Sequence, residues 1–266
     1  MKLVTENKTM SAHEILFHGS SMGLIMPSEN ARKEWTDIQI DKLIEHYNLY
    51  VHSRREMITS KYLEKGNARE EDAITLLART KKINFRKNAE RLKDEYFTGV
   101  PDVYEGKDIW NANETLDTKC SWSKNTFDKA RVKDRNPVYY YQGQVYMKLT
   151  GAKKHTIAYC LVNATPEIII SEKIKASYKY LGVDLELHEV YRKECQQIER
   201  NHIFDLQEFK DENPNFDFDS DLSEWHYDIP MDKRIYLDTF DRNEQDINMM
   251  IFRVCTARNW ITKHLI

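Results

Sequence analysis

The chain has 266 residues, of which 41% are hydrophobic, so it can build the core of one large domain or two small ones. Its formal net charge of −3 excludes a strongly basic nucleic-acid-binding composition, although a local basic groove can lie on an acidic protein. No apolar run approaches the roughly 20 residues that span a membrane, and the first residues have no signal-peptide pattern. We therefore expect no membrane association and a cytoplasmic location, in the host cytoplasm if a phage encodes the protein.

The cysteines are scattered and form neither a CxxC pair nor a Cys/His pattern with zinc spacing. They are Cys120, Cys160, Cys195 and Cys255. Thiols in such an arrangement are typical of a reducing compartment. We expect no disulfide and no zinc site.

The N-terminal segment from His13 to Met26 holds small residues at Gly19, Ser20 and Ser21 between apolar positions. This pattern predicts a turn and a short helix capped by a serine. The functional alternative is that the hydroxyl groups and free amides at the start of the helix bind a phosphate.

Apolar residues recur at near-helical spacing between Glu34 and Leu63, which predicts one or two helices. Arg54 and Arg55 are expected to be surface charges, although either could touch a phosphate. Gly66 is predicted to end one element, and Glu70 lies in the first turn of the next helix. The helix dipole favours a glutamate there. The same position would put a carboxylate beside a metal site if this helix packs next to the segment that follows.

The central segment from Thr98 to Trp122 predicts an antiparallel hairpin with its turn at Glu105 to Asp108. Asp117 and Lys119 are two apart on the second strand, so both point to one face, and the first strand can bring Asp102 close. Adjacent carboxylates repel each other unless a cation intervenes, and oxygen ligands suit Mg²⁺ or Mn²⁺. Such an ion polarises a phosphodiester and acidifies a bound water. Lys119 could then orient or deprotonate that water, or stabilise the developing charge. The alternative is an exposed hairpin with ordinary charges.

Two basic segments flank this hairpin, at residues 80–93 and 123–137. The second segment includes Lys124, Lys129 and Arg131. Basic runs are usually solvated faces of helices, but their position on both sides of a candidate metal site indicates that they guide a polyanion.

The segment from Val138 to Gly151 predicts a helix that starts after Pro137. Gln142 and Tyr146 are four apart and share a face, where they either hold the lysine and the substrate or form part of a buried tyrosine stripe. The rest of the chain predicts a buried strand, two helices, an irregular acidic segment, an edge strand and a final helix, at residues 156–162, 166–181, 186–201, 209–230, 233–240 and 245–266.

The joint order of these features resembles the PD-(D/E)XK nuclease superfamily, and within it the branch of lambda-exonuclease and YqaJ viral recombinases, close to RecB-type nuclease domains. The features are the Gly-Ser-Ser turn, Gly66 with Glu70, Pro101-Asp102, Asp117-Thr118-Lys119, and Gln142 with Tyr146. The resemblance implies one nuclease domain of α/β (α+β) class over residues 1–266. A restriction-endonuclease-like core, with a central mixed sheet flanked by helices, would occupy residues 15–165, and a helical extension residues 166–266.

The resemblance also assigns roles to residues. The metal ligands would be Glu70 (directly or through water), Asp102, Asp117 and the carbonyl of Thr118. Lys119 would be the catalytic lysine, and Gln142 and Tyr146 would brace the site. Ser20 and Ser21 would lie where the N-terminal turn of the family meets a DNA phosphate. Apart from the resemblance, the second basic segment predicts further DNA contacts by Lys124, Lys129 and Arg131. The implied reaction is Mg²⁺-dependent hydrolysis of DNA, most specifically 5′–3′ digestion of a duplex in phage recombination. A homotrimer and a single-strand annealing partner are implied in the same way.

Three departures from the family pattern matter. Asp117 stands where a glutamate is commoner, although the shorter side chain still allows coordination. No arginine directly precedes the turn at Gly19, where lambda-type enzymes use one to grip a 5′ phosphate. The cysteines do not match the iron–sulfur ligands of relatives in CRISPR adaptation, so we expect no cluster. Two alternatives stay open: a structure-specific or nicking endonuclease on the same fold, and a non-catalytic DNA-binding or assembly protein.

Overall fold

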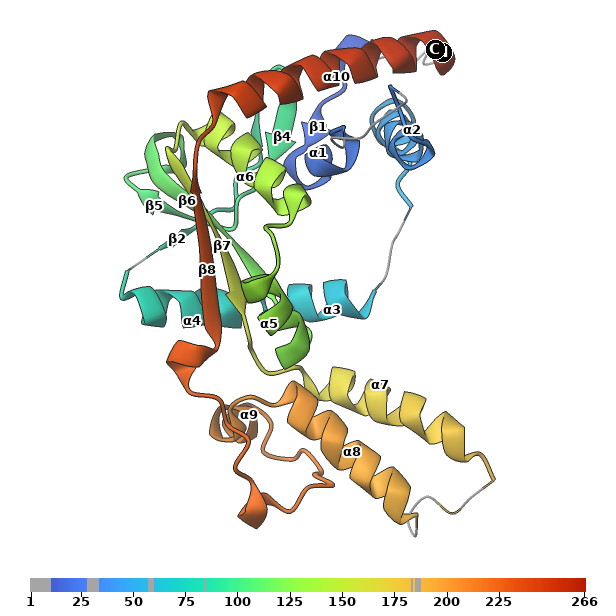
Figure 1. Ribbon diagram of the computed structural model, residues 1–266, viewed down its shortest axis with the longest axis vertical. Coiled ribbons are helices and arrows are strands. Elements are labelled where there is room, and N and C mark those ends of the chain that lie inside the picture. The colour runs from blue at the N-terminus through green and yellow to red at the C-terminus, as the bar shows by residue number, and fades with distance from the viewer. Residues whose placement is uncertain (1–10, 28–33, 57–59, 84, 183, 185–187) are drawn as a thin grey trace, which may run out of the picture.

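A five-stranded mixed sheet forms the centre of the protein (Figure 1). The computed structural model describes residues 11–27, 34–56, 60–83, 85–182, 184 and 188–266. The strand order is β2-β5-β6-β7-β8; β6 and β7 are parallel and the other neighbours are antiparallel. These strands are β2 Arg86–Lys87, β5 Val103–Gly106, β6 Ala112–Cys120, β7 Lys154–Cys160 and β8 Ile235–Asp241. The predicted hairpin is therefore β5 and β6, and β8 is the edge strand predicted at residues 233–240.

Two helices connect β6 to β7, since parallel neighbours need a crossover. They are α5 (Lys124–Val132) and α6 (Pro137–Thr150). Pro137 lies in the first turn of α6, where its missing N–H leaves no hydrogen bond unmade. Gly151 ends the helix with a φ of 80°, in the left-handed region that favours glycine. Both ends of this helix agree with the prediction.

Helix α6 covers one face of the sheet, and α4 (Glu70–Lys81) covers the other. Ile157 and Tyr159 of β7 belong to the apolar cluster on the α6 side. Asp117 and Lys119 of β6 are in register with these two residues. Neighbours in register share a face of a sheet, so both polar side chains project toward α6.

A small sheet of order β1-β4-β3 places the N-terminal turn beside the hairpin. Its strands are β1 Phe17–His18, β3 Leu92–Lys93 and β4 Phe97–Gly99. Helices α1 (Gly19–Ile25) and α2 (Asp37–His52) follow β1. The predicted serine cap is wrong: His18 occupies the N-cap position of α1, and the hydroxyl of Ser21 instead donates to the His18 carbonyl oxygen at 3.0 Å.

The prediction that Gly66 ends an element is also wrong. Helix α3 runs through it, over Lys61–Ala68, and the break before α4 falls at Arg69. The buried Lys65 ammonium donates to the carbonyl oxygens of Ser121 and Trp122 at 2.8 and 3.3 Å. This contact holds the last turn of α3 in place, so a glycine there is tolerated despite its low helix propensity.

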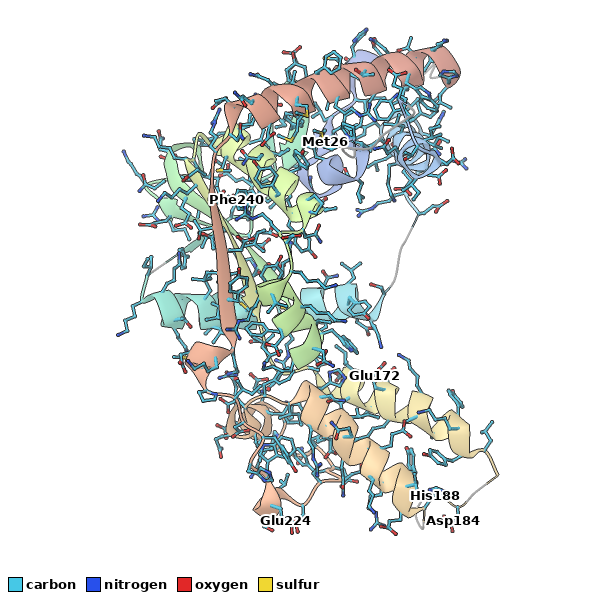
Figure 2. The ribbon with its side chains drawn as sticks, viewed as in Figure 1. Met26, Glu172, Asp184, His188, Glu224 and Phe240 are labelled. Atoms are coloured by element: carbon cyan, nitrogen blue, oxygen red, sulfur yellow. The ribbon has the colours of Figure 1, made fainter. Side chains whose placement is uncertain are left out.

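Helix α10 (Glu244–His264) lies across the N-terminal elements at the top of Figure 1. Two buried arginines join it to them. Arg253 donates to the carbonyl oxygens of Ile25 and Glu34, and Arg258 donates to those of Ile15 and Glu95. Figure 2 shows Met26 beneath this helix.

The opposite end of the molecule is a helical unit with its own apolar cluster. It contains α7 (Pro166–Ser177), the short η3 (Tyr178–Tyr180), α8 (Glu189–His202) and α9 (Leu206–Glu212). The irregular segment predicted from residue 209 begins too early, because the side chain of Asp205 caps α9 at the N–H of Glu208 and the helix continues to Glu212.

These elements confirm the predicted class, a mixed sheet flanked by helices. Within the described residues, no helix combines the length and the apolar character that crossing a bilayer requires.

Candidate active site

Asp102 directly precedes Val103, the first residue of β5, which pairs with Leu116 of β6. Its Oδ2 accepts hydrogen bonds from the backbone N–H of Thr118 at 2.7 Å and from the Thr118 hydroxyl at 3.0 Å. The N–H and C=O of a strand residue point to the same side. The carbonyl of Thr118 therefore faces the same edge as its N–H, next to the Asp102 carboxylate.

Asp117 is almost fully buried, with 3% of its surface exposed. Its Oδ2 forms an ion pair with the Lys119 ammonium and has no hydrogen-bond partner besides it among the described residues. Its Oδ1 lies 3.5 Å from Gln142 Nε2, which also donates to the Tyr146 hydroxyl at 2.8 Å. The predicted strand pair and the predicted helix pair are thus joined in one polar cluster.

The electrostatics of this cluster follow from burial of like charges. Burial, followed by the neighbouring Asp117 carboxylate, raises the pKa of Asp102 to about 7. Burial acts to lower the pKa of Lys119, but the carboxylates of Asp117 and Asp102 outweigh it and raise that pKa above its ordinary value. Burial also raises the pKa of Tyr146, so its hydroxyl stays protonated. The site therefore holds one firmly charged ammonium and a carboxyl group that is poorly ionised without a further cation.

Glu70 is the first residue of α4 and lies close enough to Asp102 for its charge to raise the pKa of that carboxyl further. Its nearest ionic partner is Lys87 of β2, at 3.2 Å between Oε1 and Nζ. Across the described ranges, no three His, Cys, Asp or Glu side chains gather closely enough to hold one ion between them. The structure therefore joins Asp102 and Asp117 but leaves Glu70 at the margin, paired with a lysine.

The donor set fits a hard divalent cation. Mg²⁺ typically binds one or two carboxylates and keeps several of its waters. Asp102 and Asp117 supply two carboxylates, and the Thr118 carbonyl faces the same edge. Among the residues that the structure describes, the buried Asp117 Oδ2 has Lys119 as its one partner.

A second polar cluster surrounds the N-terminal turn. The Ser21 hydroxyl, whose proton goes to the His18 carbonyl, also lies 2.9 Å from His46 Nε2. Burial lowers the pKa of His46 to about 3, so this ring is neutral and donates from Nε2. The Tyr50 hydroxyl lies 3.4 Å from His18 Nε2. Ser20 is exposed at the surface beside them.

Two arginines act on this cluster through their charge. After burial, the charges of Arg91 and then Arg55 lower the pKa of His18, and Arg91 also acts on Tyr50. Both arginine side chains are exposed. The sequence predicts Arg55 to be a surface charge or phosphate contact and places Arg91 in the basic segment at residues 80–93, but no pattern in it singles out His18 or Tyr50. No local spacing marks this cluster, because it combines three separate segments of the chain, which hold His18, Tyr50 with Arg55, and Arg91.

The two polar clusters are neighbours. A Cβ atom added at Gly99 would lie 2.5 Å from Cε1 of Tyr146, and one added at Gly19 would lie 3.2 Å from the same atom. The Tyr146 ring therefore packs against the start of α1 and the end of β4. Through its hydrogen bond to Gln142, it connects the N-terminal turn to Asp117.

The basic residues predicted to bind DNA lie on α5. Lys124 and Arg131 both pair with Asp128, at 2.5 and 3.7 Å, and Lys129 is exposed. These positions leave the helix with a basic surface, and contact with DNA stays a prediction.

Comparison with known proteins places this geometry on a known fold. No protein-family model and no curated protein sequence matches the chain. A phage related exonuclease from Haemophilus somnus 129PT matches with 23% identity and a TM-score of 0.64, over 93% of each chain. The alkaline exonuclease LHK-Exo from Laribacter hongkongensis matches with 10% identity and a TM-score of 0.57, over 95% of this chain and 90% of that one. Its complex with dAMP matches with 11% identity and a TM-score of 0.56, over 96% and 92%. The chain shares the fold of these exonucleases.

Proposed function

We propose that this protein is a metal-dependent deoxyribonuclease of the PD-(D/E)XK type, and specifically an exonuclease that digests one strand of a DNA duplex from its 5′ end. The observation that carries the proposal is the cluster of Asp102, Thr118, Asp117 and Lys119 at the rim of β5 and β6, braced by Gln142. The shared fold with exonucleases, one of them solved with dAMP, supports a DNA substrate.

Each residue has a distinct role in this proposal. Asp102, Asp117 and the carbonyl of Thr118 would hold a divalent ion, Mg²⁺ or Mn²⁺, which when bound polarises a phosphodiester and acidifies water. Lys119 orients the attacking water and balances the charge that develops on the phosphate oxygens. Gln142 fixes Asp117, and Tyr146 fixes Gln142.

The 5′ preference rests on the second polar cluster. The charges of Arg55 and Arg91 act on His18, which directly precedes α1 and its residues Ser20 and Ser21. Arginine and hydroxyl donors match phosphate oxygens, so in this proposal these residues receive a terminal phosphate. The start of α1 lies one side chain, Tyr146, away from the carboxylates. In this proposal, Arg55 and Arg91 replace the phosphate-binding arginine that is missing directly before the turn at Gly19. A trimeric assembly and a single-strand annealing partner belong to the same proposal through the family resemblance.

The test is digestion of end-labelled linear duplexes in Mg²⁺, with either a 5′ phosphate or a 5′ hydroxyl, beside closed circular DNA. We expect loss of one strand from the 5′-phosphorylated duplex, slower loss from the hydroxylated one, intact circles, and no reaction with a chelator. Nicked circles would favour the endonuclease instead.

Two variants make the assignment specific. Asp117→Ala should abolish cleavage while the protein stays folded. Lys119→Ala should lose turnover yet keep its affinity for Mn²⁺; a loss of the metal would reassign this lysine to binding. Undiminished activity of the Asp117 variant would remove the proposed site.

A further inference from the structure

A row of side chains crosses the sheet beside the candidate active site. Lys119 of β6 is in register with Tyr159 of β7, which is in register with Tyr236 of β8. The two tyrosine rings are stacked, with centroids 6.0 Å apart and planes inclined by 20°. Tyr159 is only 9% exposed. The strands thus present Lys119 next to a rigid aromatic surface.

Tyr139 completes this surface from above. It lies three residues before Gln142 and seven before Tyr146 on α6, so all three project from one face of the helix. The Lys119 ammonium lies 4.8 Å from the centroid of the Tyr139 ring. That ring contacts Tyr159, with centroids 6.3 Å apart. One helix face therefore contacts the lysine through Tyr139 and the aspartate through Gln142, and Tyr146 on the same face accepts a hydrogen bond from Gln142.

We propose that Tyr139 is a positioning residue for Lys119: its ring face holds the ammonium at the edge of the carboxylate cluster by a cation–π contact. This inference rests on the proposed function and extends the Gln142–Tyr146 pair by one helical turn.

Lys119 needs such a contact because Asp117, its ion-pair partner within the described part of the chain, is itself a proposed metal ligand. A lysine side chain has a flexible four-carbon stem and loses much rotational freedom when its ammonium is fixed. Asp117 Oδ2 is the atom that Lys119 pairs with, and it is also an oxygen that the metal site requires. An aromatic ring attracts an ammonium but offers no lone pair to a hard cation. The Tyr139 ring can therefore hold the Lys119 ammonium in place when Asp117 acts as a metal ligand.

Packing alone would also place a tyrosine here, since Tyr139 borders the apolar cluster between α6 and the sheet. The two roles differ in what they require of the ring. Packing depends on its volume, whereas a cation–π contact depends on the electron density of its face. Substitutions that change one property without the other separate them.

The experiment measures kcat and KM on linear duplex for Tyr139→Phe, Tyr139→Leu, and phenylalanines carrying one to three fluorine atoms at this position. Fluorine withdraws electron density and leaves the shape of the ring nearly unchanged. We expect Tyr139→Leu to lower kcat about tenfold with KM within about twofold, Tyr139→Phe to recover most of the loss, and each added fluorine to lower kcat further. Tyr178→Leu, at an exposed tyrosine of the helical unit, is the matched control and should turn over normally.

A second readout needs neither metal nor turnover. The rate at which an amine-specific reagent labels Lys119 in metal-free protein, followed by mass spectrometry, should rise several-fold in Tyr139→Leu and stay near the wild-type rate in Tyr139→Phe. Thermal unfolding of each variant controls for loss of structure.

The outcomes are distinct. If the wild type is active and the fluorinated and leucine variants have the same kcat as the wild type, the role of Tyr139 is overturned and the proposed function stands. A wild type that leaves DNA intact overturns the proposed function and this role with it. Equal labelling of Lys119 in the leucine and phenylalanine variants also contradicts the contact.

Discussion

Asp102 is the residue whose chemistry depends most on its surroundings. Its carboxyl group is buried beside Asp117, and its pKa is raised to about 7 from an ordinary value of 3.8. Between these two values the folded protein keeps a proton that the unfolded chain has released. The unfolding free energy of metal-free protein must therefore fall as pH rises through this window, and the dependence on this group ends above about pH 7.

We expect this loss to be about 1 kcal/mol per pH unit between pH 5 and 7, measured as the difference in unfolding free energy between wild type and Asp102→Asn. The difference isolates Asp102 from the other titrating groups. Excess Mg²⁺ should remove the loss, because a bound cation favours the ionised carboxyl. A pH-independent difference between the two proteins would show that Asp102 ionises normally.

At this scale the sequence predicts contacts within one element and misses contacts between segments. Asp117 and Lys119 share a strand face because their spacing requires it, and the structure pairs them. Lys87 forms an ion pair with Glu70, and the charge of Arg91 lowers the pKa of His18, only because β2 and the small sheet bring distant segments together. No periodicity in these segments predicts either interaction.

Helix α6 is the element on which the site depends, and its distance from the sheet is set by Gly143. A Cβ atom there would collide with the His155 ring and lie 2.6 Å from Cζ of Phe240. Gly143→Ala should destabilise the protein by about 1–3 kcal/mol through overpacking. It should also lower cleavage more than unfolding explains, because Gln142 moves away from Asp117. Urea unfolding and kcat, measured together, check both effects.

Gly66 supplies the matched control. It lies inside α3, and an added Cβ would meet no described atom within 4 Å. Gly66→Ala should therefore stabilise the protein by about 0.5–1 kcal/mol and leave cleavage unchanged. If the two substitutions had the same effect, the close packing of α6 would not be what positions the site.

Elements were predictable where local chemistry decides them. Pro137 and Gly151 define both ends of α6, and the hairpin pattern around Asp117 and Lys119 predicts β6. Prediction failed where tertiary contacts override local preference. Lys65 holds α3 together past Gly66, and Ser21 lies one turn too late to cap α1, so its hydroxyl turns back to His18.

Across the whole molecule, the net charge of −3 hides a basic surface on α5, the one predicted to meet DNA. If Lys129 touches a phosphate, its removal releases about one fewer counterion on binding. The slope of log K against log salt for Lys129→Ala should then be shallower by about 1. Duplex binding measured with a chelator present checks this. Lys193→Ala on α8, where the lysine pairs with Glu189, should keep the wild-type slope.

Helix α10 has a consequence for how the protein is made. Its two buried arginines close the N-terminal segments around Ile15 and Ile25, more than 200 positions earlier in the chain. During synthesis on the ribosome, the segments around Ile15 and Ile25 therefore cannot pack against α10 until this helix, which ends at His264, has emerged. The segments around Ile15 and Ile25 and helix α10 would therefore complete their packing together, in a late step of folding.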